Sequence, residues 1–229
     1  LYHFWPNDLP KRRDEEGSEA LKTEGEGLLL STENTITYTA KFNKRHNLKV
    51  MAGYSASRNT NANTSVRADG LVMDDLQWNN LNGTSRKENY TISSGKTQVT
   101  RQSVFGRINY NYRSRYYLTV TGRVDGSSNF AANRKWGFFP SAAFKWNIKN
   151  EPFLKKVGWV DDLSLRLSAG RSGNDAISAY RSLQQYGSST SNYIFDGTMG
   201  VVYYPSRLAN PNLTWEKTDQ YNVALEASF

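Results

Sequence analysis

The sequence predicts an all-β chain that forms an antiparallel portion of a transmembrane β-barrel with long extracellular loops. Segments of about ten residues alternate apolar and polar side chains, as strands do when one face meets lipid. Short and long connections alternate between these segments, as periplasmic turns and extracellular loops do in such barrels. Aromatic residues gather where the segments end, at the expected boundaries between lipid and water.

The composition is that of strands and turns. Tyr, Phe and Trp make up 13% of the 229 residues, and Asn, Ser, Thr and Gly are frequent. The mean hydropathy is -0.69, and no apolar run approaches the roughly 18 residues of a membrane helix. Because the chain has no cysteine, disulfides and thiolate chemistry are excluded. The start "LYHFWPND" has no features of a secretory leader, which predicts a mature or internal piece.

The first predicted hairpin follows a polar lead-in. Residues 1–28 are irregular and are expected to be loop-like. The segments "STENTITYTAKF" (31–42) and "LKVMAGYSA" (48–56) both alternate apolar and polar residues, and residues 43–47 form a short turn between them. The polar stretch 58–98 then predicts an extracellular loop.

The second predicted hairpin has the same plan. "SVFGRINYNY" (103–112) and "YYLTVTGRV" (116–124) alternate over their whole length, and the tight turn 113–115 joins them. The loop "DGSSNFAANRK" (125–135) follows and is expected on the extracellular side, because it stands at the opposite end from the short turn.

The fifth predicted strand, "WGFFPSAAFKW" (136–146), begins and ends with tryptophan on one face. Its ten residue steps span roughly 33 Å, or roughly 23 Å in height at a tilt of roughly 45°, which matches the roughly 25 Å apolar band of barrels. Pro140 cannot donate to a ladder, so a bulge or a gap in pairing is expected there. The aromatic residues assigned to the membrane interfaces are Tyr110, Tyr112, Tyr116, Trp136 and Trp146.

Two more strands complete the pattern, "LSLRLSAGR" (163–171) and "TDQYNVALEASF" (218–229). The third extracellular loop, 172–213, lies between them, and its stretches "SNYIFDG" and "GVVYYPS" could pair as a small hairpin above the membrane. About seven strands result, whereas single-chain bacterial barrels have even numbers, so a larger barrel is expected. The polar faces carry the residues predicted to face the lumen: Arg107, Asn109, Asn111, Arg123 and Arg166.

Residues for catalysis or metal binding are scarce. With two histidines and no cysteine, zinc sites and Cys-His catalysis have no candidates. The neighbouring pairs Asp74–Asp75 and Asp161–Asp162 face opposite ways in a strand and are expected to cap turns. No catalytic residue, metal ligand or cofactor site is therefore predicted, and the chain is expected not to be an enzyme; calcium in the Asp- and Asn-rich loops is left open. The net charge of +8 comes from basic residues scattered over turn-like segments, which argues against a nucleic-acid surface.

Several segments resemble one family. "RYYLTVTGRVDGSSNFAANRKWGFFPSAAFKWNI" (115–148) resembles a signature of the SusC/RagA-type TonB-dependent transporters of Bacteroidetes. "NEPFLKK", "LSLRLSAGRSGND" and "LANPNLTWEKTDQYNVALEASF" follow in the order found in that family. The resemblance covers roughly residues 26–229, almost the whole chain.

The resemblance implies a role in the bacterial outer membrane. It implies a larger barrel, of about 22 strands, with an N-terminal plug, energy from TonB, and a SusD-like surface lipoprotein as a lid. The implied cargo is a glycan oligosaccharide or a peptide. No segment resembles the plug or the TonB box, so residues 1–229 are interpreted as a partial barrel domain whose partners are the rest of the barrel, the plug and membrane lipid.

Cargo contacts are expected from loop aromatics, since aromatic rings stack on sugar faces; the alternative is that these rings only pack the loops. Two other functions stay open at this point. A soluble β-sandwich that binds glycans would fold in water without detergent. A surface glycan hydrolase would need two converging carboxylates, and no such pair shares a strand face. The loop aromatics chosen are Trp78, Tyr90, Tyr193, Phe195, Tyr203 and Tyr204.

Overall fold

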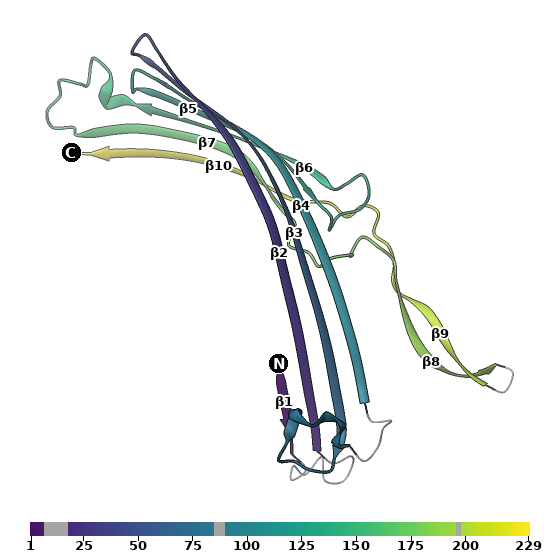
Figure 1. The fold of residues 1–229 in the computed structure, drawn as a ribbon. Helices are drawn as coiled ribbons and strands as arrows, with labels where there is room; N and C mark the ends of the chain where they lie inside the picture. Colours follow the sequence, from purple (N-terminus) through teal and green to yellow (C-terminus); the bar gives the residue numbers. More distant parts are fainter. Residues whose placement is uncertain (7–17, 85–89, 196–197) are drawn as a thin grey trace. The chain divides into compact units, whose positions relative to one another are not determined.

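The computed structural model describes residues 1–6, 18–84, 90–195 and 198–229 (Figure 1). Among these residues, no helix has the length and apolar character needed to cross a membrane. The described part of the chain contains the short 3-10 helices η1 (Gln77–Asn79), η2 (Leu81–Gly83) and η4 (Ile148–Asn150). The strands are β1 (Tyr2–Trp5), β2 (Ser18–Phe42), β3 (His46–Leu71), β4 (Tyr90–Tyr112), β5 (Tyr116–Ser127), β6 (Trp136–Asn147), β7 (Asp162–Asn174), β8 (Gln185–Phe195), β9 (Thr198–Arg207) and β10 (Glu216–Ser228).

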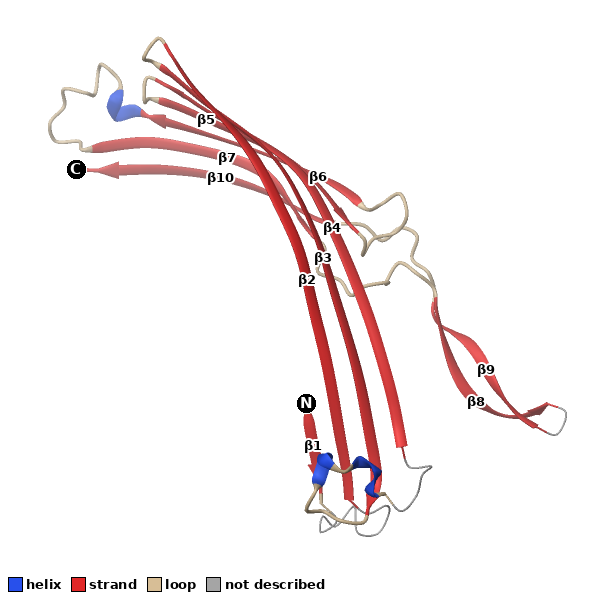
Figure 2. Ribbon diagram, in the orientation of Figure 1, coloured by secondary structure: helices blue, strands red, loops and turns tan. Residues whose placement is uncertain are grey.

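The strands form one large sheet and one separate hairpin (Figure 2). The sheet has the order β1-β2-β3-β4-β5-β6-β7-β10, and β8 pairs with β9 in the hairpin. Neighbours in the sheet follow chain order, except that β10 lies beside β7 because the β8–β9 hairpin is inserted between them. The predicted all-β antiparallel fold is confirmed, and so is the small hairpin expected within residues 172–213.

The described residues divide into two compact units. Unit 1 contains Leu1–Leu30 and Arg58–Gln98, and unit 2 contains Ser31–Ser57 and Val99–Phe229. The core of unit 1 is small. It consists of buried Ala20, Ala68 and Leu71, against which Phe4, Trp78, Leu81 and Tyr90 pack.

Two segments expected to be loops are largely strand. β2 already begins at Ser18, and β3 and β4 occupy much of residues 58–98. Polar contacts between neighbouring strands support this part of the sheet: the Thr23 and Ser65 hydroxyls lie 2.9 Å apart. A strand with polar residues on both faces lacks the apolar alternation by which strands are recognised. The loop interpretation was therefore wrong for residues 18–28, 58–71 and 90–98, whereas residues 7–17 and 85–89 lie outside the described part of the chain.

The two short turns are formed as predicted. Asn43 and Lys44 have φ of 50° and 52°, and Arg113 and Ser114 have 51° and 55°. Two consecutive positive φ values define the hairpin turn whose twist matches that of the flanking strands. The Asn111 side chain also accepts a hydrogen bond from the Ser114 backbone at 2.8 Å, which stabilises a turn without glycine.

The expected gap at Pro140 is confirmed. Pro140 is paired with Gly122 of β5, whereas the β6–β7 register ends at Ser141↔Gly170. The Phe139 ring packs into this region, because a Cβ added at Gly173 would lie 2.2 Å from its Cζ. The proline is therefore tolerated where β6 and β7 separate.

Candidate functional site

The residues predicted to face the lumen lie on the polar face of unit 2. Arg107 lies opposite Thr121 and Asn109 opposite Thr119 in the β4–β5 register. The Arg107 Nε donates to Thr121 Oγ1 at 3.3 Å, and the Thr119 hydroxyl donates to the Asn109 side-chain oxygen at 3.0 Å. Side-chain hydrogen bonds between β4 and β5 therefore stabilise the polar face. That this face lines a lumen stays a prediction.

Arg123 makes several polar and ring contacts on this face. Its Nε donates to Asp125 at 2.6 Å and its Nη2 donates to the Ser103 hydroxyl at 2.8 Å. The guanidinium also lies over the Phe105 ring, 5.1 Å from the centroid. Phe105 in turn covers Gly53, where a Cβ would be 2.3 Å from the ring. Glycine at position 53 thus allows the stack of ring and guanidinium to form.

Arg166 and Lys145 both form ion pairs with the carboxylate of Glu226. Glu226 of β10 accepts from Arg166 at 3.1 Å and from Lys145 at 3.3 Å, and the Ser164 hydroxyl bonds it at 3.1 Å. Sequence reasoning missed Lys145 and Glu226. The alternation puts each on the polar face, but only the strand order β6-β7-β10 brings them to Arg166.

Four of the five interface aromatics gather at the end with the short turns. Tyr116 lies opposite both Tyr112 and Trp146, with ring centroids 6.3 and 6.4 Å apart. Tyr110 bonds the His46 ring nitrogen through its hydroxyl at 2.6 Å. Trp136 lies at the other end of β6 and covers Gly126. The aromatic edges expected from the sequence are thus present at both ends of β6, and their place at the membrane interface stays a prediction.

The loop aromatics do not form a single site. Trp78 stacks on Tyr2 at 5.9 Å and packs with Tyr90 against the core of unit 1, so these two rings pack the loops together. Tyr203 and Tyr204 of β9 are exposed and remain available to a ligand. Tyr193 and Phe195 lie in β8, where their side chains fall outside the described residues.

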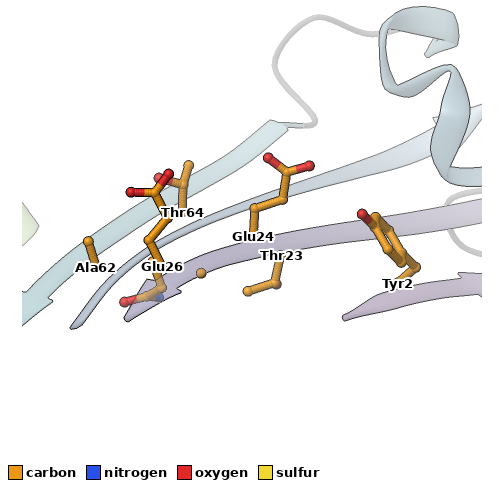
Figure 3. A pocket seen from close by; sticks show the side chains of 8 residues that line it. Tyr2, Thr23, Glu24, Glu26, Ala62 and Thr64 are labelled. Atoms are coloured by element: carbon orange, nitrogen blue, oxygen red, sulfur yellow. The ribbon is translucent and has the colours of Figure 1, made fainter. Parts of the chain in front are cut away.

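A hollow of about 660 Å³ in unit 1 contains none of the predicted cargo residues. Figure 3 shows Glu24, Glu26 and Thr64 directed to the same side of the sheet. Glu24 is paired with Lys22 at 3.0 Å, so part of the acidic charge is compensated. The lining offers hydrogen-bond acceptors rather than a reactive group. The residues are Tyr2, Thr23, Glu24, Gly25, Glu26, Ala62, Asn63 and Thr64.

No metal site is evident in the described part of the chain, since no three His, Cys, Asp or Glu side chains cluster there in a suitable way. Of the two aspartate pairs, Asp74 is bonded by the Ser18 hydroxyl. Asp161 donates its backbone N–H to Ser228 at 2.8 Å. Calcium binding in the loops stays a prediction.

The segments that resemble the family signature converge near the base of the long loops. Asp175 accepts from Arg101 at 2.6 Å and from the Ser127 hydroxyl at 2.8 Å. Asn129, of which 1% is exposed, donates to the backbone carbonyls of Asp175 at 3.2 Å and Ile177 at 3.1 Å. The "DGSSN" and "GND" segments therefore fasten the start of loop 175–184 to β4 and β5.

Trp215 fastens the end of the connection that runs from β7 to β10. Its ring lies 4.9 Å from Phe130 and 5.3 Å from Phe139, and its Nε1 donates to the Lys135 carbonyl at 2.9 Å. The Ala131 N–H also donates to the Leu213 carbonyl at 3.2 Å. The signature residues thus hold both ends of the connection between β7 and β10 in place. The hairpin β8–β9 lies between these two ends.

The fold and these surfaces define a class of protein. A single antiparallel sheet with short turns at one end, long loops at the other, and an apolar face with aromatic edges is the wall of an outer-membrane β-barrel. Among the described residues no second sheet covers the apolar face, on which Val223 is 77% exposed. A sandwich buries such a face against a second sheet, so the exposure of Val223 favours the barrel wall.

The chain belongs to the TonB-dependent receptor-like β-barrel family, whose model matches residues 7–229. A TonB-dependent receptor of Formosa agariphila is 36% identical over 198 residues, which are 86% of this chain and 20% of that protein. The TonB-dependent receptor SusC of Bacteroides thetaiotaomicron is 42% identical over 136 residues, 58% of this chain and 14% of SusC. The structure of the RagAB peptide transporter matches with a TM-score of 0.85 and 25% identity, over 99% of this chain and 24% of that one.

These similarities confirm the predicted relation to the SusC/RagA-type proteins of Bacteroidetes and the location in the outer membrane. The chain spans about a fifth or less of the curated relatives described above. The family comprises receptors and transporters and is not a class of enzymes.

Proposed function

We propose that this chain forms part of the barrel wall of an active importer that takes up glycan oligosaccharides or peptides across the outer membrane. The observation that supports this most is the division of the sheet of unit 2 into an exposed apolar face and a polar face with hydrogen-bonded cations. A wall between lipid and an aqueous passage requires both faces. The names of the relatives, a receptor SusC and a peptide transporter RagAB, support import as the activity.

The proposed partners are the remaining barrel strands, a plug, TonB at the inner membrane and a SusD-like surface lipoprotein. We further propose that import involves no resident cofactor and no catalysis by this chain. The proposed cargo contacts are the exposed rings of Tyr203 and Tyr204, because exposed aromatic side chains are the usual anchors in recognition.

The cargo contact can be tested in the full-length transporter. The double variant Tyr203→Ala/Tyr204→Ala is expected to weaken cargo binding at least about tenfold, since aromatic anchors carry much of a binding free energy. Cargo is first identified by deleting the gene in the native bacterium and measuring growth on panels of glycans and peptides. Binding of that cargo to the purified transporter is then measured by calorimetry.

Tyr38→Ala is the matched control, because Tyr38 is also exposed but lies on the apolar face of β2. Unchanged binding in the double variant, with normal uptake, would refute the role of the two tyrosines and leave import itself standing. Unchanged growth of the deletion strain on every glycan and peptide would contradict import.

A further inference from the structure

The outer side of the sheet has an apolar band that ends abruptly on two neighbouring strands. Tyr221 and Val223 of β10 are 78% and 77% exposed, and Ala169 and Leu167 of β7 lie opposite them. Because the chain lies in the outer membrane, lipid chains cover this band. The band consists of Leu163, Leu165, Leu167, Ala169, Tyr221, Val223, Leu225 and Ala227.

One step beyond the band, the two strands carry opposite charges. Arg171 lies opposite Asp219 and donates through Nε at 2.6 Å and through Nη2 at 2.8 Å. At the other end of the band, Phe229 stacks on Trp159. The roughly ten residue steps from Phe229 to Asp219 span about 33 Å, or about 23 Å in height at a tilt of about 45°. If the Trp159–Phe229 end marks the periplasmic interface, this span puts the ion pair at the headgroup level of the outer leaflet.

A hollow of about 370 Å³ lies directly beside this ion pair. It opens where the β6–β7 register ends at Ser141↔Gly170, and small side chains such as Ala142 and Ala169 leave it unfilled. Arg171 and Asp219 form part of its lining. The complete lining is Pro140, Ser141, Ala142, Ala169, Gly170, Arg171, Asp219 and Tyr221.

The Arg171 guanidinium has more hydrogen-bond donors than Asp219 engages. Asp219 engages Nε and Nη2 of Arg171, and the guanidinium has two further N–H donors on Nη1. Lys217 lies two residues before Asp219 on the same face of β10 and is exposed. Arg171, Lys217 and Asp219 together carry one net positive charge, and the carboxylate orients the guanidinium. A planar guanidinium beside an ammonium is a typical arrangement for binding phosphate.

We propose that this hollow binds lipid A, the phosphorylated glycolipid of the outer leaflet. One acyl chain lies along Pro140, Ala142 and Ala169, in continuity with the lipid-covered band. A phosphate accepts hydrogen bonds from Arg171 Nη1 and Lys217. The apolar lining of the hollow thus suits an acyl chain, and its cationic rim suits a phosphate. Lipid A presents both groups together at the headgroup level of the outer leaflet.

The test uses the full-length transporter purified in mild detergent and native mass spectrometry after addition of defined lipids. The probes are diphosphorylated lipid A, dephosphorylated lipid A and phosphatidylglycerol, each added alone. We expect the wild type to retain diphosphorylated lipid A best, and the variant Arg171→Gln/Lys217→Gln to retain at least about tenfold less of it. Ala169→Phe fills the hollow without changing the charge and is expected to reduce retention as well.

Lys155→Gln/Lys156→Gln is the matched control, because it removes two exposed positive charges outside the strands and should leave lipid retention unchanged. Heat-dependent gel migration shows whether each variant is a folded barrel. Equal retention of phosphorylated and dephosphorylated lipid A, equal retention of phosphatidylglycerol, or full retention by folded Arg171→Gln/Lys217→Gln would overturn the proposal. Cargo uptake does not enter this measurement, so the result is independent of the proposed import.

Discussion

Asn129→Leu is expected to lower the free energy of local opening at the base of the long loop by about 2–4 kcal/mol. Asn129 is 1% exposed, and its amide nitrogen bonds the carbonyls of Asp175 and Ile177. Leucine has a similar volume but no donor, so the Ile177 carbonyl loses the Asn129 bond, and the Asp175 carbonyl keeps only its bond from the Ile177 N–H, at 2.7 Å. Arg101 and Ser127 bond only the side chain of Asp175. They therefore do not hold the backbone that follows Asp175.

Hydrogen exchange in the full-length transporter measures this opening. The backbone amides of Ala131 and Asn210, which bond Leu213 and Ser182, are expected to exchange about 30–1000 times faster in the variant. Asn222→Leu is the control: Asn222 is exposed and makes one contact of 3.5 Å with Ser168. Unchanged exchange at Ala131 and Asn210 would show that the Asn129 bonds do not hold the base of the loop.

The strands inside the membrane were predictable because lipid imposes a period of two on the sequence. Apolar residues at every second position identified β5, β6 and β7 almost to their ends, and a break in the ladder could be placed at Pro140 because proline lacks an N–H. These are local signals: each can be recognised within one segment.

The polar extensions of β2, β3 and β4 were not predictable in this way. They lack a regular alternation of apolar and polar residues, and the stretch 58–98 has the composition of a loop. Pairing between distant strands supports them instead, as in the contact of Thr23 with Ser65. A single sequence does not record such a contact.

The contacts at the base of the long loops show the same limit. The residues of "DGSSNF" and "NPNLTWE" were recognised as a signature, but their spatial relation was not. Phe130 and Trp215 are 85 positions apart in the sequence, and their rings lie 4.9 Å apart only because β10 returns beside β7. Among the candidate site residues, the faces of Arg107 and Arg123 followed from alternation, whereas the partners Ser103, Glu226 and Asp175 did not.

Glu151→Gln is expected to remove a stabilising effect that depends on pH at the end with the short turns. The Glu151 carboxylate accepts from the Tyr116 hydroxyl at 2.6 Å, from Trp146 Nε1 at 3.1 Å and from Arg115 at 3.1 Å. These bonds, that of Tyr116 first, lower the pKa of Glu151 below its ordinary value of 4.5. The charged carboxylate of Glu151 therefore stabilises the folded state more than the neutral acid does. It also holds the rings of Tyr116 and Trp146 in place.

The sign of the pH effect follows from this lowered pKa. The stabilisation is complete above the ordinary pKa of the carboxyl group and is lost as the pH falls from about 4.5 through the lower folded value. In wild-type transporter, the unfolding temperature measured by tryptophan fluorescence should therefore fall by a few degrees over this range beyond the general effect of acid.

Glu151→Gln should be less stable at neutral pH and lose that extra decrease, whereas Glu216→Gln, at an exposed carboxylate bonded to Asn174, should keep it. Parallel pH curves for wild type and Glu151→Gln would contradict the assignment, because a carboxylate that titrates equally in both states contributes nothing to the pH dependence of stability.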